Sequence, residues 1–175
     1  MKFFSDIRLL LLAIWLGAAV FFIGVAQSAF AVISDREVAG AVVGRNLTIL
    51  NLAGIGIATI ILLTSFLGMK NVNKVWLWIE RFLLLIVGAA CAVGQFVIGF
   101  WLSSIRTQMG KPIEEVATDD PLRIQFDLVH RYSEWTLVAA MAAALLACFI
   151  ISNRKFGPGK TDKADIYDFS KEFKI

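Results

Sequence analysis

Four stretches of the chain contain no Asp, Glu, Lys, Arg or His, and the charged residues are grouped before, between and after them. Each stretch is at least 19 residues long. At a rise of about 1.5 Å per residue, such a length suits the roughly 30 Å of hydrocarbon in a bilayer. The pattern predicts an all-α, polytopic membrane protein, a four-transmembrane-helix bundle with spans at 9–33, 46–69, 82–105 and 130–153.

The fourth helix is expected to extend well beyond the membrane. Asp119 or Asp120 can cap it, with Pro121 at its first helical position. A helix over 121–153 would be about 50 Å long, more than a bilayer needs. Its outer half carries an ionic stripe within about 100° of arc, which is either a water-facing surface or part of a functional site. The stripe consists of Arg123, Asp127, His130, Arg131 and Glu134.

The composition supports a single membrane domain. Hydrophobic residues make up 58% of the chain and charged residues only 18%, whereas soluble domains have about a quarter charged residues. No stretch between the spans is long enough to fold around a core of its own. We expect one domain over 1–153 and a polar cytoplasmic tail over 154–175. A soluble catalytic domain, nucleic-acid binding and intrinsic disorder are excluded.

The 17 Lys and Arg residues are distributed unevenly about the predicted spans. Both termini and the loop between spans two and three carry 11 of them, and the two remaining loops carry 6. By the positive-inside rule, we expect a multi-pass protein of the cell inner membrane or plasma membrane with both termini cytoplasmic. The first span should stay attached, because its uncharged run exceeds the 7–15 residues of a signal-peptide core.

Two local patterns concern the start of the second span. Ser34 and Glu37 have the spacing of a capping box, which predicts that a helix restarts there and that residues 35–45 form an outer amphipathic turn or two. A stripe of small residues at i, i+4 spacing follows, and it predicts a close approach between two helices. The stripe consists of Gly40, Gly44 and Thr48.

Polar residues also fall within or beside the outer halves of the spans. Such groups normally face neighbouring helices or a wet cavity, where they find partners. We therefore predict an outward-facing polar pocket that binds a small ligand or an ion. The alternative is a structural or partner-binding membrane subunit, in which the same residues only hold the bundle in register. The candidate ligand-binding residues are Arg45, Asn51, Gln95, His130, Arg131 and Glu134.

Common catalytic and metal-binding patterns are missing from the sequence. His130 is the single histidine, so one chain cannot form a bis-histidine haem or multi-histidine zinc site. Cys91 and Cys148 fall in apolar spans and are expected to pack as small residues. We expect no enzyme activity, no metal and no cofactor. The expected partners are the lipid bilayer and a small ligand or a protein, with a homo-oligomer left open and nucleic acid excluded.

Several short segments carry a family resemblance. Residues 126–133 read FDLVHRYS, residues 15–17 read WLG, and residues 39–40 and 44–45 read AG and GR. Over most of residues 7–153 the chain resembles the transmembrane protein 205-like family of small four-helix membrane proteins. The most specific element is F-x-x-L-H-R-x-S, in which Val129 replaces the usual Leu. The resemblance implies a four-helix bundle and an important site at His130 and Arg131, but no reaction.

The charge distribution predicts the topology directly. In a variant without Cys91 and Cys148, a cysteine placed at Glu114 should react with a membrane-impermeant thiol reagent in intact cells. A cysteine placed at Lys163 should react only after the cytoplasmic face is exposed, because the positive-inside rule places that segment inside. The reverse labelling order would show that the predicted orientation is wrong.

Overall fold

Long helices form almost the whole of the computed structural model, which describes residues 2–66 and 74–153. α3, the π-helical turn η1 and α4 follow one another without a break and form a single rod, so four rods are long and apolar enough to cross a membrane. The predicted all-α, four-span fold is confirmed, and the chain is an integral membrane protein. The elements are α1 (Lys2–Val32), α2 (Arg36–Phe66), α3 (Lys74–Ala92), η1 (Val93–Ile98), α4 (Gly99–Met109), the 3-10 turn η2 (Ile113–Glu115) and α5 (Pro121–Ser152).

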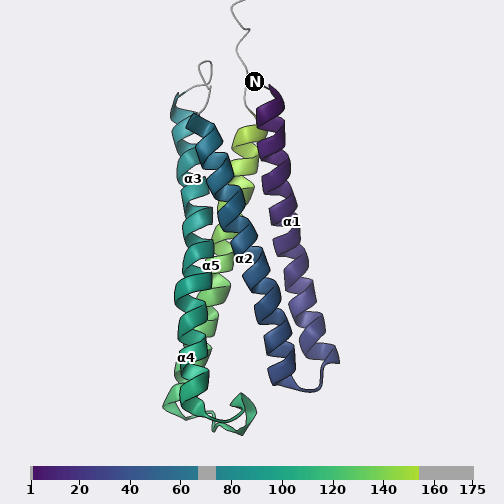
Figure 1. The fold of residues 1–175 in the computed structure, drawn as a ribbon, viewed down its shortest axis with the longest axis vertical. Helices are drawn as coiled ribbons and strands as arrows, with labels where there is room; N and C mark the ends of the chain where they lie inside the picture. The colour runs from purple at the N-terminus through teal and green to yellow at the C-terminus, as the bar shows by residue number, and fades with distance from the viewer. Residues whose placement is uncertain (1, 67–73, 154–175) are drawn as a thin grey trace, which may run out of the picture.

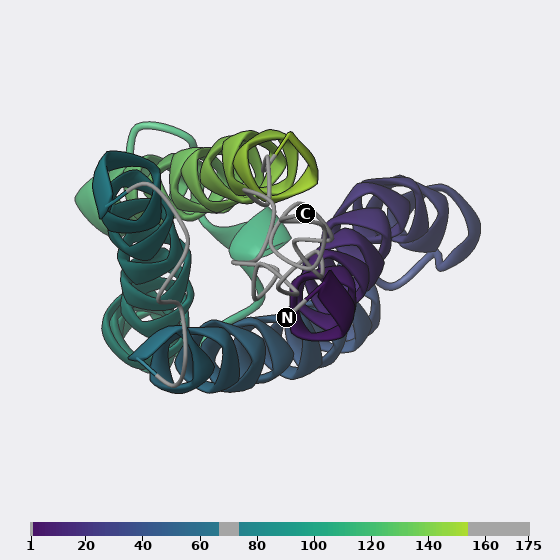
Figure 2. The same cartoon turned by 90° about the horizontal axis from the view of Figure 1, so that it is seen from above.

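The rods form two antiparallel hairpins, α1–α2 and α3/α4–α5 (Figure 1). We call the end at which α1 begins and α5 ends the terminal end, and the opposite end the loop end. α2 packs on both α1 and α3, and α5 packs on both α3 and α1. The hairpins lie close together at the terminal end and diverge toward the loop end, because α2 runs from the side of α3 to the side of α1 (Figures 1 and 2).

The helix starts agree with the sequence in part. The Asp120 carboxylate accepts the Leu122 N–H at 2.8 Å with Pro121 next to it, so the predicted cap of the fourth helix is confirmed. At α2, however, the capping group is Asp35 and not Ser34. The Asp35 Oδ1 accepts the N–H groups of Glu37 and Val38 at 2.9 and 3.1 Å. The predicted restart of the helix is confirmed, and residues 36–45 form the continuous first turns of α2.

The core lies along the terminal half and the middle of the bundle. α5 contributes four buried alanines at helical spacing, and such small side chains let neighbouring helices approach closely. The opposite faces of the rods expose large apolar side chains, as expected for helices surrounded by lipid. The main buried cluster is formed by Leu12, Trp15, Ala19, Leu50, Ala58, Ile61, Leu83, Leu84, Val87, Cys91, Ala140, Ala143, Ala144, Ala147 and Ile151.

Gly54 on α2 is the point where three helices meet most closely. A Cβ atom at this position would lie 2.6 Å from Cys91 Sγ on α3 and 2.7 Å from Trp15 Nε1 on α1. The missing side chain leaves room for Trp15, whose Nε1–H donates a buried hydrogen bond of 2.9 Å to the Leu50 carbonyl. A side chain on α1 is thereby tied to the backbone of α2 inside the membrane.

The small-residue stripe at the start of α2 does not pack against another helix as predicted. A Cβ built on Gly44 would meet nothing within 4 Å among the residues that are described. At Gly40 it would meet only the tip of the Arg106 side chain, at 3.3 Å. The predicted close approach of two helices at this stripe is therefore wrong within one chain, because the hairpins have already diverged there.

The contact at Gly54 predicts a sharp difference between two neighbouring glycines. Gly54→Ala should lower the free energy of unfolding by about 1–3 kcal/mol, because the new methyl group must displace Trp15 or Cys91. Gly56→Ala should leave it unchanged or raise it, because a Cβ there meets nothing within 4 Å and Ala favours a helix. Thermal unfolding of the detergent-solubilised variants measures both, and equal effects would contradict the packing described here.

Candidate functional site

The ionic stripe on α5 contains two separate side-chain pairs, Arg123–Asp127 and His130–Glu134. The Arg123 Nε atom donates to Asp127 Oδ2 at 3.4 Å, and another Arg123 nitrogen donates to the Ile113 carbonyl in the turn before the helix. His130 Nε2 lies 3.5 Å from Glu134 Oε1, a contact that becomes an ion pair when the imidazole is protonated. In each pair at least one side chain is more than half exposed, and exposed ion pairs add little stability. These pairs fix the positions of side chains along the stripe, which stays exposed.

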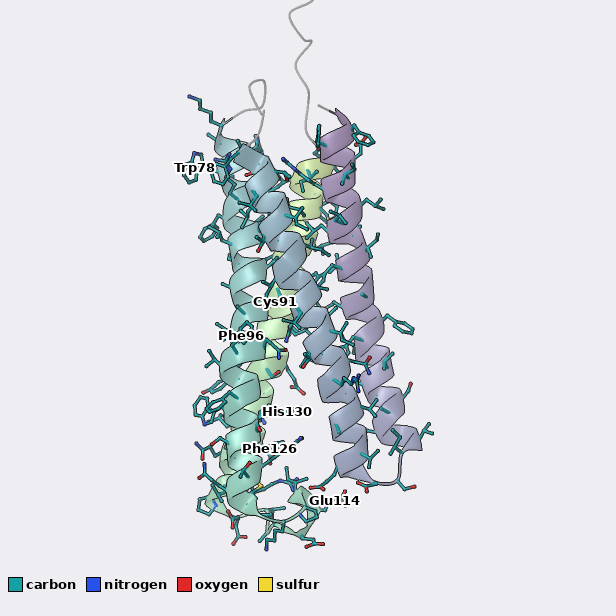
Figure 3. All side chains as sticks on the ribbon, viewed as in Figure 1. Trp78, Cys91, Phe96, Glu114, Phe126 and His130 are labelled. Carbon is teal, nitrogen blue, oxygen red and sulfur yellow. The ribbon has the colours of Figure 1, made fainter. Side chains whose placement is uncertain are left out.

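An arginine from α4 links this part of α5 to the other hairpin. The Arg106 guanidinium lies over the Phe126 ring at 5.2 Å, and its tip reaches the backbone of α2 at Gly40. His130 stacks on the same Phe126 ring. The two rings are nearly parallel, with their centroids 6.1 Å apart. Phe126 and His130 therefore lie on the side of α5 that looks toward α2, as Figure 3 shows.

Asn51 lines a small cavity between three of the rods. Its side chain is 5% exposed and lies beside Gly94 of the π-helical turn, where a Cβ would be only 3.3 Å from Asn51 Nδ2. Ser133 and Thr136 of α5 form the opposite wall. The cavity measures about 10 Å³, enough for roughly one water molecule. It is partly polar, and it is far smaller than the usual pocket of a small-molecule ligand.

The six candidate residues are not gathered around one pocket. Asn51 alone lines the small cavity, and Gln95 is half-buried in the adjacent π-helical turn. His130 and Glu134 contact each other on the exposed flank of α5. Arg45 and Arg131 are exposed, and neither forms a hydrogen bond or ion pair within residues 2–66 and 74–153. Whether any of them binds a ligand stays a prediction.

At the depth of these residues, neighbouring helices differ in the polarity of their surfaces. The loop-end layer is the part of the bundle between the Asn51–Gly94 contact and the Gly40–Arg106 contact. Within it α2 carries Arg45, while α5 carries His130 and the charged residues Arg131 and Glu134. α1 and α4 expose large apolar side chains at the same depth, including Phe21, Phe100 and Trp101. Charged and apolar surfaces therefore lie side by side at one level of the membrane.

A second ionic group, at the terminal end, was missed by the sequence reasoning. Arg8 on α1 and Glu80 on α3 lie 3.9 Å apart, with side chains 4% and 0% exposed. Next to them, Arg81 donates two hydrogen bonds of 2.8 Å to Ser65 on α2 and lies over the Phe66 ring. Arg8 and Glu80 stand just outside the uncharged runs, so the sequence placed them at the membrane surface.

The described part of the chain contains no group of three or more His, Cys, Asp or Glu side chains arranged to hold a metal ion. Cys91 is buried and Cys148 half-buried, both as free thiols. The arrangement offers positioned charges, one small polar cavity and a buried ion pair, and we derive no chemical reaction from it.

The comparison with protein families matches residues 10–111 to a domain of unknown function, DUF4149. The match covers more than half of the chain. The chain belongs to the DUF4149 family. The searches of curated proteins and of solved structures gave no match. The match spans α1 to α4 except for the first turns of α1, and it ends before α5, so His130 and Arg131 lie outside the part that defines this DUF4149 protein.

The Arg8–Glu80 pair generates a prediction about the stability of the DUF4149 protein. Glu80→Gln alone should lower the free energy of unfolding by about 3–5 kcal/mol, because it leaves the buried Arg8 guanidinium without this carboxylate. The double variant Arg8→Met, Glu80→Met should be more stable than Glu80→Gln alone, because neither charge of the pair remains. Chemical or thermal unfolding in detergent measures these differences, and a double variant that is no more stable than Glu80→Gln would show that the two side chains are not coupled.

Proposed function

We propose that this DUF4149 protein is a non-catalytic subunit of a membrane complex and that a protein partner binds the loop-end layer of α5. Arg131 carries this proposal. It lies two residues after the fully buried Val129 and thus on the opposite side of α5, facing away from the bundle. A charged side chain next to the apolar run of α5 is stabilised by an opposite charge, and the described part of the chain provides none for Arg131. An acidic group of a partner would supply it.

The surroundings of Arg131 support a partner more than open water. Tyr132 and Trp135, next to it on α5, expose half or more of their surface. Aromatic residues and arginine are enriched where proteins bind one another. Tyr and Trp also gather at membrane interfaces, so the site would lie at the outer membrane surface if the termini are cytoplasmic. The resemblance of FDLVHRYS to the transmembrane protein 205-like family, a finer assignment than DUF4149, points to the same residues.

A small ligand bound between the hairpins is the second candidate function. Its support is the position of His130, which stacks on Phe126 on the side facing α2, next to the Arg106 side chain that bridges the hairpins. The cavity at Asn51 is too small for such a ligand, which would have to lie nearer the loop end. Binding of a small ligand would depend on His130, whereas binding of the protein partner would depend on Arg131.

Site-specific crosslinking tests the partner. A photoreactive amino acid placed at Tyr132 should form an adduct with one protein in intact membranes of the native host. Arg131→Glu should reduce that adduct at least tenfold, because the charge contact becomes repulsive. The matched control is Lys111→Glu, the same charge change in the connection before α5, which should leave the adduct intact. An adduct that is insensitive to Arg131→Glu but is lost in His130→Gln would favour the second candidate instead.

A further inference from the structure

A groove runs between α1 and α2 on the lipid-facing side of the first hairpin. Its volume is about 260 Å³, far larger than the cavity at Asn51. Along α1 it extends from Ile14 to Val25, about 16 Å at the helical rise. Its walls are apolar except for Asn46 at the loop end. The groove is therefore long, narrow and apolar, with a polar group at one end.

The surroundings of the groove show what kind of molecule reaches it. The large apolar side chains at its rim, Ile14, Phe21 and Ile49, are each more than half exposed. Both helices are of membrane-spanning type at this depth, so the groove opens to hydrocarbon and not to water. A protein helix is about 10 Å wide, too wide for a groove of this volume. A single hydrocarbon chain has the matching shape.

The loop end of the groove provides a complementary charge. Arg45 lies one helical turn before Ile49 and directly before Asn46, at the loop-end edge of the groove and outside its lining. Its side chain is exposed and has no ion-pair partner in the part of the chain that the structure describes. A long arginine side chain can lie along apolar surface and place its guanidinium at the level of lipid headgroups. The guanidinium then binds a phosphate oxygen with charge-assisted hydrogen bonds.

We propose that this groove is a binding site for one phospholipid, with an acyl chain between α1 and α2 and its phosphate on Arg45. The site is separate from the partner surface on α5 and does not depend on it. The bound lipid would fill the space between α1 and α2 beside the Trp15–Leu50 contact. Because Arg45 is a cation without an internal partner, the site should prefer an anionic headgroup to a zwitterionic one.

Fluorescence quenching by brominated lipid tests the proposal on the purified full-length chain. A variant with Trp76, Trp78, Trp101 and Trp135 replaced by Phe retains only Trp15, which lines the groove. In vesicles containing phosphatidylglycerol brominated on its acyl chain, Trp15 should be quenched. Ala18→Phe fills the groove from α1 and should reduce the quenching at least twofold, as should Ala53→Leu from α2. The matched control Ala13→Phe lies on α1 outside the groove and should leave quenching unchanged.

The headgroup is tested in the same Trp15 variant. At a low fraction of brominated lipid, phosphatidylglycerol should quench at least threefold more effectively than phosphatidylcholine, and Arg45→Gln should bring the ratio near one. Equal quenching by both lipids before substitution, or quenching unaffected by both groove-filling variants, would overturn the proposal. A dimer that protects Trp15 from lipid and dissociates in Ala18→Phe would overturn it in favour of a second copy. No partner protein is present, so these results stand apart from the crosslinking at α5.

Discussion

The bundle depends on one close contact in the middle of the membrane, where α1 and α3 both reach the backbone of α2 at Gly54. Trp15 passes the bare Cα of this glycine to donate to the Leu50 carbonyl, and Cys91 fills the other side. Apolar side chains gain little by leaving lipid for a protein interior, so close packing and hydrogen bonds must hold membrane helices together. Gly54 permits both at one point, and the divergence of the hairpins begins beyond it.

The divergence explains why the two ends of the molecule use charge differently. At the terminal end the helices are close enough to enclose Arg8 and Glu80 completely. At the loop end α2 has moved to the side of α1, and charged residues of α5 remain exposed. The contacts that cross the gap there are made by long side chains, through Arg106 to Gly40 and through Arg36 to Glu114, whose Nε and Oε1 atoms are 3.0 Å apart. Arginine and glutamate side chains are therefore packed inside the bundle at the terminal end and lie on its surface at the loop end.

The sequence predicted the fold well because its signal is a length of uncharged chain, which the bilayer sets directly. The Asp120–Pro121 start of α5 was equally readable, since a cap is a local pattern. The candidate site was harder to predict, because the rotation and tilt of the helices decide whether its residues come together. The spacing of Asn51 and Arg45 on α2 does not reveal that one points at Gly94 and the other to the exterior. Nor does a linear pattern show that Gly54 packs while Gly44 remains open. Arg8 and Glu80 lie at the ends of their spans, where a charge looks like a membrane anchor until its partner is known.

The lengths of the uncharged runs provide the last link between fold and surroundings. At about 1.5 Å per residue, the uncharged runs of the first three spans are about 36–39 Å long, whereas that of α5 is about 28 Å. The second hairpin therefore joins a long apolar rod to a helix with a shorter apolar run. A bilayer matched to the short run would leave the apolar end of α1 in the headgroup region, and one matched to the long runs would immerse the charges of α5. Neither thickness satisfies every helix, so the loop-end layer is stable only where something other than bulk lipid covers it. An acidic partner group at Arg131 would relieve this mismatch on the second hairpin.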